Sequence, residues 1–254
     1  MTLDFTGRMV AVIGGTSGMG LAIAQALEAA GGRVAVLGRD DEWFPEAARS
    51  LRGLVQKGDA TDPAAVESLL EAAGPVDGLV HVAGGSGRAW GDGPLHELTD
   101  DGLGQTMALN FHSAVWSNRA AVRHWLQRGT GGSIVNIGSV LARSPSPEHF
   151  STVAYASAKA AMEGFTRAIA AAYAAQSIRA NVVAPGLVET PMSRRAAGNP
   201  EIVSFVHRKQ PLDGGRMGRP DDLTGAVLYL LSDAARFCTG QVLAVDGGWT
   251  LSGA

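Results

Sequence analysis

Short apolar segments alternate with longer alanine-rich segments along this chain, and this alternation constrains the fold more than any other feature. The short segments carry Val, Ile and Leu on successive residues, as strands covered on both faces do. They are residues 9–13, 34–37, 54–56, 79–82, 133–137, 180–183 and 242–245. The longer segments have helical periodicity, and they are residues 18–30, 63–73, 100–127, 153–176 and 221–231. The alternation predicts an α/β fold, with a doubly wound, mostly parallel sheet of seven strands and helices on both faces.

Composition and charge exclude several classes of partner. The 254 residues contain no linker-like segment, so we expect a single domain spanning residues 1–254. A net charge of −3 with scattered basic residues argues against nucleic acid and anionic membranes as partners. The first residues lack a signal-peptide pattern, and no apolar run is long enough to span a bilayer. Because Cys238 is the only cysteine, no internal disulfide can form, and we expect a cytoplasmic protein.

A glycine-rich turn links the first predicted strand to the first predicted helix, in the sequence GGTSGMG. Glycine allows a tight turn and a close approach of the backbone to a ligand. The N–H groups at the start of the helix then face an anion, which the helix dipole attracts. A turn without a ligand is the alternative, but the strand before it and the helix after it favour the pyrophosphate of a dinucleotide. The residues expected at this anion are Gly14, Thr16, Ser17, Gly18, Met19 and Gly20.

Tyr155 and Lys159 share one face of the predicted helix 153–176, one turn apart. A phenol is a poor base at neutral pH because its ordinary pKa is about 10, and a neighbouring ammonium lowers that pKa. Ser139 follows the predicted strand 133–137 and can donate a hydrogen bond to a substrate oxygen. A surface pair and a strand-ending serine are the alternatives. The position of the three residues after one strand, at the sheet edge where ligands bind, favours proton transfer at a substrate oxygen.

These motifs together resemble the short-chain dehydrogenase/reductase family, in its single-domain form. The glycine spacing, the Ser, Tyr and Lys positions, the Pro-Gly loop 185–190 and the segment 240–248 stand in the family's order, and the resemblance covers essentially the whole chain. Ile13 stands where the family usually has Thr. The resemblance implies a Rossmann-like fold and an NAD(P)(H)-dependent oxidoreductase that interconverts an alcohol and a carbonyl compound.

The resemblance also implies a catalytic set of Asn110, Ser139, Tyr155 and Lys159. Tyr155 would exchange the proton with the substrate oxygen, and Ser139 would polarise that oxygen. Lys159 would lower the pKa of Tyr155 and hold the nicotinamide ribose. Asn110 would distort its helix and help protons pass from Lys159 to water. Because all four residues are present, we expect an active enzyme.

Further cofactor-binding residues are implied only by the resemblance. Asp59 would cap the adenine, the chain at Ala83 and Gly84 would pass the adenosine ribose, and the Pro-Gly loop would hold the carboxamide. The full additional set is Asp59, Ala60, Ala83, Gly84, Tyr155, Lys159, Pro185, Gly186, Val188 and Thr190. His81 and Val82 stand where the family has two Asn residues that tie neighbouring strands, so we expect this change to affect stability more than chemistry. No further metal-ligand residues stand near His81, and no metal site is expected.

Gly38 and Arg39 follow the second predicted strand and bear on the choice of cofactor. An acid at the end of this strand would bind the ribose 2′-hydroxyl and repel a 2′-phosphate. Gly38 removes that repulsion, and the Arg39 guanidinium suits a phosphate in charge and geometry. Asp40 and Asp41 could instead hold Arg39 away by ion pairing, and Arg39 could be a solvated charge. We expect NADP(H) to be preferred, with NAD(H) as the alternative.

Three segments are expected to wall the cleft for a small alcohol or carbonyl substrate: residues 86–96, 140–153 and 187–215. Candidate lining residues, for which ordinary packing is the alternative, are Trp90, His149, Phe150, Met192 and Phe205. Arg194, Arg195 and Arg208 are either solvated charges or contacts to an anionic substrate. The resemblance implies packing between subunits through the C-terminal segment and two long helices, so we expect a homotetramer.

The scaffold admits three alternative functions, of which the third shares the expected chemistry. An epimerase or dehydratase of the extended relatives would have a longer chain and Gly at the position of Ser17. A non-catalytic cofactor-binding protein would have lost part of the catalytic set. A 3-oxoacyl-thioester reductase uses the same chemistry, and the sequence does not separate it from an enzyme acting on another alcohol.

Overall fold

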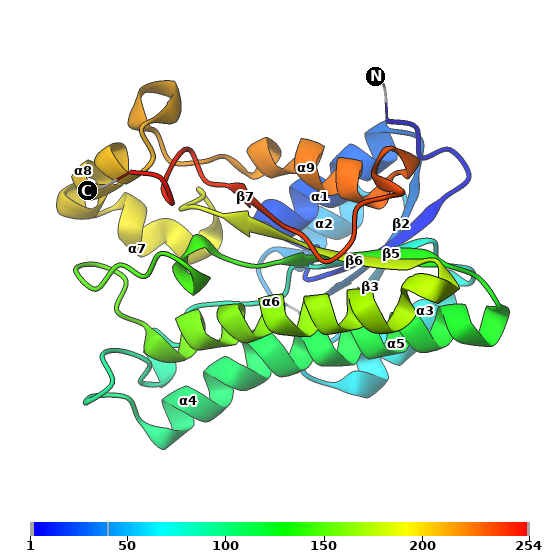
Figure 1. Cartoon of the computed structure of the whole chain (residues 1–254), viewed down its shortest axis with the longest axis horizontal. Coiled ribbons are helices and arrows are strands. Elements are labelled where there is room, and N and C mark those ends of the chain that lie inside the picture. Colours follow the sequence, from blue (N-terminus) through cyan, green and yellow to red (C-terminus); the bar gives the residue numbers. More distant parts are fainter. Residues whose placement is uncertain (1–2, 40, 253–254) are drawn as a thin grey trace.

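Seven parallel strands form one sheet in the computed structural model, which describes residues 3–39 and 41–252 (Figure 1). The strands are β1 (Met9–Ile13), β2 (Arg33–Gly38), β3 (Leu54–Lys57), β4 (Gly78–His81), β5 (Gly132–Ile137), β6 (Ile178–Pro185) and β7 (Val242–Val245). Their order across the sheet is β3-β2-β1-β4-β5-β6-β7. The order in which strands are added reverses at β1, which pairs with β2 on one side and with β4 on the other. A crevice therefore opens at the carboxyl ends of β1 and β4. The predicted doubly wound, Rossmann-like α/β fold is confirmed.

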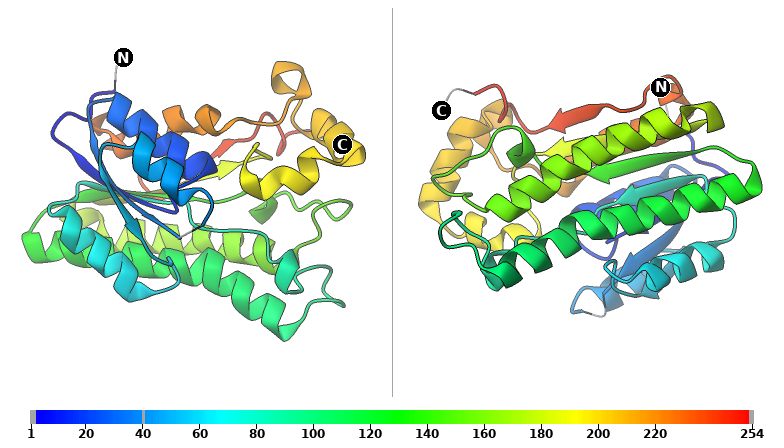
Figure 2. Two further views of the ribbon diagram at one scale, coloured as in Figure 1. Left: turned by 180° about the vertical axis from the view of Figure 1, so that it is seen from behind. Right: turned by 60° about the horizontal axis from the view of Figure 1, so that its bottom comes forward.

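Helices cover both faces of this sheet, as Figures 1 and 2 show. One face carries α1 (Gly18–Ala29), α2 (Phe44–Ser50) and α9 (Thr224–Leu231). The other face carries α3 (Pro63–Ala73), α4 (Asp100–Met107), α5 (Ser113–Arg128) and α6 (Val153–Tyr173). Two further helices, α7 (Arg194–Ala197) and α8 (Pro200–Lys209), lie near the carboxyl ends of the strands. Within the described ranges, no helix combines the length and apolarity needed to cross a membrane.

The central strand β1 shows how the sheet joins two apolar cores. Its odd-numbered residues pack with α3, α5 and α6, whereas Val10 and Val12 pack with α1 and α9. All five β1 side chains are buried, and burying a Val or Ile side chain contributes roughly 1.5–3 kcal/mol. The sheet edge that carries the site is therefore held rigidly from both faces.

Three short helices were not predicted from the sequence: α2, α7 and α8. The segment 187–215, expected as a loop, contains α7 and α8. Asn199 caps α8 by accepting from Glu201 N and Ile202 N, at 2.9 and 3.3 Å. Phe205 and its neighbours on the apolar face of α8 pack on the buried Trp249. The Asn199-Pro200 pair was an available start signal.

The long helix expected over residues 100–127 is interrupted where Asn110 lies. A π-helical turn, Ala108–His112, separates α4 from α5. The Asn110 amide donates to Thr106 O at 3.0 Å and to Gly85 O at 2.9 Å, and its oxygen accepts from Gly85 N at 3.0 Å. A π-turn within an α-helix is rare and is frequent at functional sites. The helix is distorted at Asn110, as the family resemblance implies.

His81 occupies the strand position where the family usually has an Asn, and it makes new ties. The fully buried imidazole lies 3.2 Å from Ser113 Oγ and 2.9 Å from Ser117 Oγ, so it links β4 to α5. Desolvation and the charge of Lys159 lower the pKa of His81 to about 3. The imidazole is therefore neutral at physiological pH.

Candidate active site

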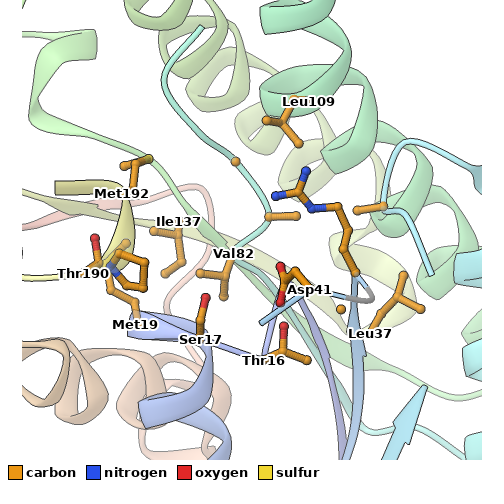
Figure 3. Close-up of a pocket in the computed structure, with 18 of the residues that line it drawn as sticks. Thr16, Ser17, Met19, Leu37, Asp41, Val82, Leu109, Ile137, Thr190 and Met192 are labelled. Atoms are coloured by element: carbon orange, nitrogen blue, oxygen red, sulfur yellow. The ribbon is translucent and has the colours of Figure 1, made fainter. Parts of the chain in front are cut away.

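Two adjoining cavities lie at the carboxyl ends of the strands. The first, which we call the glycine-loop cavity, has a volume of about 170 Å³ and is bordered by Thr16, Ser17, Leu37 and Ile137 (Figure 3). The second, which we call the outer cleft, has a volume of about 640 Å³ and continues from it past Tyr155. This is the sheet edge at which doubly wound folds bind ligands.

Most of the predicted cofactor-binding residues line these two cavities. Those at the glycine-loop cavity are Gly14, Thr16, Ser17, Gly18, Met19, Gly38, Arg39, Asp59, Ala60, Ala83, Gly84, Tyr155, Lys159 and Thr190. Those found only at the outer cleft are Pro185, Gly186 and Val188. Gly20 lines neither, because it packs against the turn itself: a Cβ at Gly20 would overlap the carbonyl oxygen of Gly14. Gly20 therefore brings helix and strand together rather than facing a ligand.

The glycine loop has the geometry of a cradle for a large anion. Gly14 and Gly18 have φ angles of +83° and +49°, a region that favours glycine. A Cβ at Gly14 would lie 2.6 Å from Ala83 N, and one at Gly18 would lie 3.1 Å from Thr190 Cγ2. Helix α1 begins at Gly18, and the Ser17 side chain does not cap it. The first N–H groups of α1 are thus available to an anion, so the residues present fit the pyrophosphate of a dinucleotide.

The end of β2 is sterically closed to an acidic side chain. A Cβ at Gly38 would overlap the side chain of Thr16, so an acid at this position would displace Thr16. Arg39 is exposed and borders both cavities. Asp41 accepts from Trp43 N at 3.1 Å, and no ion pair joins it to Arg39 in the described part of the chain. Asp40, the other expected competitor for Arg39, lies outside the described residues.

Asp59 lies at the adenine end expected for the dinucleotide and is also part of a local turn. Its Oδ1 accepts from Thr61 N at 2.8 Å and from Thr61 Oγ1 at 2.7 Å. The carboxylate is thereby oriented at the wall of the glycine-loop cavity, next to Ala60. Both interpretations of Asp59, as a turn residue and as a ligand-facing carboxylate, are compatible with this geometry.

Ser139, Tyr155 and Lys159 meet where the two cavities join. Tyr155 borders both cavities, Ser139 borders the outer cleft, and Lys159 borders the glycine-loop cavity. The Ser139 hydroxyl lies close enough to the Tyr155 phenol to lower its pKa. The Lys159 Nζ atom lies 5.7 Å from the centroid of the Tyr155 ring and donates to Ile137 O at 2.9 Å. The geometry therefore brings a hydroxyl, a phenol and an amine to one point.

The electrostatics of this group differ from the expectation in one respect. Desolvation raises the pKa of Tyr155, and the Ser139 hydroxyl partly opposes it. Burial of the phenol outweighs the expected lowering by Lys159, whose amine donates to Ile137 O. Desolvation also lowers the pKa of Lys159 to about 8. Tyr155 is therefore a neutral phenol at pH 7, ready to donate a proton.

Asn110 belongs to the site without lining either cavity. It is fully buried, and a Cβ at Gly84 would lie 2.8 Å from its Oδ1 and 3.2 Å from Lys159 Nζ. Both atoms therefore lie on the same side of Gly84, where any side chain at this position would collide with them. Asn110 fixes the turn after β4 through Gly85, directly beside the amine of Lys159.

The Pro-Gly loop is braced from behind by a buried glutamine. Gln210 accepts from Leu187 N and donates to Leu187 O, at 3.2 Å for the second bond. A Cβ at Gly186 would lie 2.5 Å from the Gln210 side chain, so the loop needs glycine there. Thr190 ends the loop and lies beside the glycine loop, where Figure 3 shows it near Met19.

Asp92 is a residue of the site that the sequence analysis missed. It is buried, and its two carboxylate oxygens accept from Ala154 N and Tyr155 N, each at 3.0 Å. Thr152 precedes α6 and makes no side-chain cap, so Asp92 supplies the cap from the segment 86–96. Nothing local could have indicated this contact, because the two partners are 62 and 63 residues away.

The outer cleft is walled by parts of the three expected segments. Of the candidate lining residues, Trp90, Phe150 and Met192 border it. His149 and Phe205 instead form a ring cluster behind the wall, with centroids 5.0 Å apart. Within the described ranges, no group of three or more His, Cys, Asp or Glu residues is arranged to hold a metal ion.

The three arginines considered for an anionic substrate lie in different places. Arg195 borders the outer cleft. Arg194 pairs with Glu42 at 3.7 Å and stacks over Trp43 at 5.0 Å. Arg208 bonds within α8 to Ser204 Oγ at 3.1 Å, away from the cleft. Only Arg195 of these three therefore faces the space beside Tyr155.

Comparison with known proteins gives the same class as the fold and the site. Residues 13–250 match the profile of a family described as enoyl-(acyl carrier protein) reductase. The chain is 36% identical over 254 residues to a galactitol 2-dehydrogenase (L-tagatose-forming) of Cereibacter sphaeroides, covering 96% of both chains. The chain belongs to the short-chain dehydrogenase/reductase family. It is a dehydrogenase that acts on the CH–OH group of secondary alcohols with NAD(P).

Solved structures of relatives superpose along nearly the whole chain. A short-chain type dehydrogenase/reductase from Mycobacterium ulcerans has a TM-score of 0.89 at 31% identity, covering 98% of this chain and 92% of its own. A protein from Beutenbergia cavernae, described as an NAD(P)-dependent gluconate 5-dehydrogenase with NADP bound at low occupancy, has a TM-score of 0.87. Its identity is 32%, over 99% of this chain and 100% of its own.

Proposed function

We propose that this enzyme interconverts a secondary alcohol and a ketone with Tyr155 as its proton-transferring residue and with NADP(H) as its preferred cofactor. The observation that carries the proposal is the meeting of Ser139, Tyr155 and Lys159 at the junction of the two cavities. A dinucleotide in the glycine-loop cavity would reach this junction from one side, and a substrate in the outer cleft would reach it from the other. NAD(H) is the alternative cofactor.

The residues that would hold the dinucleotide follow from the geometry of its cavity. The glycine loop and the first N–H groups of α1 would bind the pyrophosphate. Asp59 and Ala60 would face the adenine, and Ala83 and Gly84 would pass the ribose closely. The loop from Pro185 to Thr190, braced by Gln210, would position the nicotinamide. When bound, the nicotinamide accepts a hydride from the carbinol carbon or returns one to the carbonyl carbon.

The protein's own residues handle the proton. In carbonyl reduction, the neutral phenol of Tyr155 donates its proton to the carbonyl oxygen as hydride reaches the carbon, and Ser139 hydrogen-bonds the same oxygen. In alcohol oxidation the phenol first loses its proton to solvent, and the phenolate of Tyr155 then takes the hydroxyl proton of the substrate. Lys159 stabilises the phenolate formed in reduction because its charge lies beside the ring. Asn110 fixes the backbone at Gly85, beside Lys159. A proton would return from solvent to Lys159 past this backbone.

The preference for NADP(H) is supported by the end of β2. Gly38 offers no carboxylate, and Thr16 leaves no room for one. Arg39 borders the glycine-loop cavity and can pair with a 2′-phosphate through its planar fork. The Beutenbergia cavernae relative carries NADP.

The substrate class is supported by a different relative. The galactitol 2-dehydrogenase of Cereibacter sphaeroides forms L-tagatose, so it oxidises a secondary alcohol to a ketone.

A panel of ketones and secondary alcohols, including polyols, tests this function when nicotinamide absorbance is followed with both cofactors. The Tyr155→Phe variant should lose at least about a thousandfold in kcat, since general acid–base catalysis contributes about 10²–10⁴-fold and Phe removes the proton altogether. Its affinity for NADPH, measured by fluorescence titration, should stay within threefold. Tyr173→Phe, a change of the same kind in the same helix, is the control. Full activity of Tyr155→Phe would refute the assigned role.

We also propose that the chain works as a single domain, in the cytoplasm and as a homotetramer. Cys238, the lone cysteine, suits a reducing compartment. Phe237 is fully exposed, and Leu243 on the edge strand β7 is exposed. Both belong to the C-terminal part of the chain, which the family resemblance places between subunits, and exposed apolar side chains favour such association. Sedimentation velocity at micromolar concentration decides this, and a purely monomeric protein would contradict it.

A further inference from the structure

Two arginines from different segments meet at one carbonyl oxygen beside the outer cleft. Arg88 Nη2 donates to His149 O at 3.1 Å, and Arg195 Nη2 donates to the same oxygen at 3.4 Å. Arg88 lies in the 3₁₀ helix Arg88–Trp90 after β4, and Arg195 lies in α7. Both side chains border the same cavity as Ser139 and Tyr155. The three segments that wall the cleft are therefore tied at a single point.

The two guanidinium groups are exposed, and in the described part of the chain neither forms a direct ion pair with a carboxylate, whereas Arg194 next to them pairs with Glu42. Desolvation lowers the pKa of Arg88, and the charge of Arg195 lowers it further, with only Asp92 opposing. Asp92 itself is bound to the start of α6. Glu148 faces the ring of His149 rather than either arginine. Like charges held together in this way are relieved by an anion placed between them.

The geometry also leaves donors for such an anion. A guanidinium has five N–H groups in a planar fork, and each arginine directs one nitrogen at the His149 carbonyl. The remaining donors can bind a carboxylate through two parallel hydrogen bonds. Next to the pair, Phe150 and Trp249 line the cleft, with ring centroids 5.7 Å apart. These rings provide an apolar surface for the carbon skeleton of a substrate.

We propose that Arg88 and Arg195 bind a carboxylate of the substrate, so that the enzyme acts on hydroxy acids and keto acids whose alcohol or ketone reaches Tyr155. The inference rests on the proposed function and deepens it by assigning the substrate class. The two arginines fix the acid end of the substrate, and the aromatic wall contacts its body. Ser139 and Tyr155 receive the oxygen that reacts.

The test compares keto acids with their neutral methyl esters: 4-oxopentanoate, 4-oxocyclohexanecarboxylate and the two esters. Wild type should show a higher kcat/KM for the acids. In Arg88→Gln and in Arg195→Gln, kcat/KM for the acids should fall at least tenfold, mainly through KM, and kcat/KM for the esters should stay within threefold. Arg208→Gln removes the same charge from an exposed position of the neighbouring helix α8 and serves as the control. An acid-to-ester ratio unchanged in both cleft variants would overturn the proposal.

A binding measurement separates this proposal from the proposed function. Calorimetric titration of cyclohexanecarboxylate, which cannot react, into the protein with NADP should show binding that Arg88→Gln and Arg195→Gln weaken at least tenfold. If wild type reduces the esters but binds this acid no better than the variants do, only the carboxylate site fails. If wild type turns over no ketone or alcohol with either cofactor and the acid still binds through the arginines, the proposed function fails and the anion site stands.

Discussion

At the residue scale, the cofactor site depends on the absence of a side chain at Gly38. Thr16 fills the space that an acidic side chain at this position would need. The proposed preference for NADP(H) thus rests jointly on an absent side chain at Gly38 and on the charge of Arg39. Under this proposal, a Gly38→Asp change alone should not reverse the preference, because the new carboxylate must first displace Thr16.

Arg39→Gln should raise KM for NADPH at least tenfold and leave KM for NADH within threefold. The reason is that the 2′-phosphate loses a charged hydrogen-bond partner, which is worth about 1.5–3 kcal/mol. Steady-state kinetics with both cofactors at a saturating ketone concentration measure the effect. Arg33→Gln, at the opposite end of β2, is the matched control. Equal changes for NADPH and NADH would argue against a phosphate contact at Arg39.

Local motifs made much of the site predictable from the sequence. The glycine loop and the Tyr155–Lys159 pair are each contained within a few residues, so the periodicity of one helix or turn places them. Asp92 and the Arg88–Arg195 pair depend instead on how separate segments fold over the sheet edge. No spacing encodes such contacts. The direction of the pKa shift at Tyr155 differs from the expectation for a related reason, because it depends mainly on burial of the phenol, which many segments produce together.

At the element scale, helix α6, which carries Tyr155, begins on the carboxylate of Asp92 in the separate segment 86–96. The two N–H groups bound by Asp92 belong to Ala154 and Tyr155, so the cap fixes the backbone that carries the phenol. A carboxylate at a helix N-terminus is also favoured by the helix dipole. Element prediction succeeded where the apolar periodicity was clear, and it missed α2, α7 and α8, which span seven, four and ten residues.

Asp92→Asn should lower the free energy of unfolding by about 1–2 kcal/mol, because the amide can accept only one of the two N–H bonds and carries no charge. It should also lower kcat several-fold while KM for the cofactor stays constant, because the backbone at the start of α6, which carries Tyr155, is no longer fixed. Urea unfolding and steady-state kinetics measure the two effects. Asp100→Asn in the first turn of α4, an exposed carboxylate, is the control. If both variants behave alike, the cap has no role in positioning Tyr155.

At the scale of the whole molecule, one buried imidazole makes the stability of the fold depend on pH. In the folded protein the pKa of His81 is about 3, below its ordinary value of 6.5. The unfolded chain therefore binds a proton between these values that the folded chain does not bind. Stability from this group is complete above pH 6.5 and is lost progressively as the pH falls toward 3.

His81→Asn should remove this pH dependence. Between pH 7 and pH 5, wild type should lose about 2 kcal/mol more unfolding free energy than the variant does, because 1.5 pH units correspond to roughly that amount. Urea unfolding at several pH values gives the slopes. His96→Asn, which removes an exposed imidazole, is the control and should keep the wild-type slope. Parallel slopes for wild type and His81→Asn would show that the buried ring does not govern acid sensitivity.

The cap that Asp92 provides for α6 also has a consequence for the redesign of this enzyme. The segment 86–96 carries Arg88, which borders the outer cleft, and Asp92, which caps the helix that carries Tyr155. A graft that replaced the whole segment to obtain a new specificity would remove the anchor of Tyr155 at the same time. Chimeras should therefore keep an acceptor at position 92 and vary only its flanks, so that a change of substrate does not cost the enzyme its turnover.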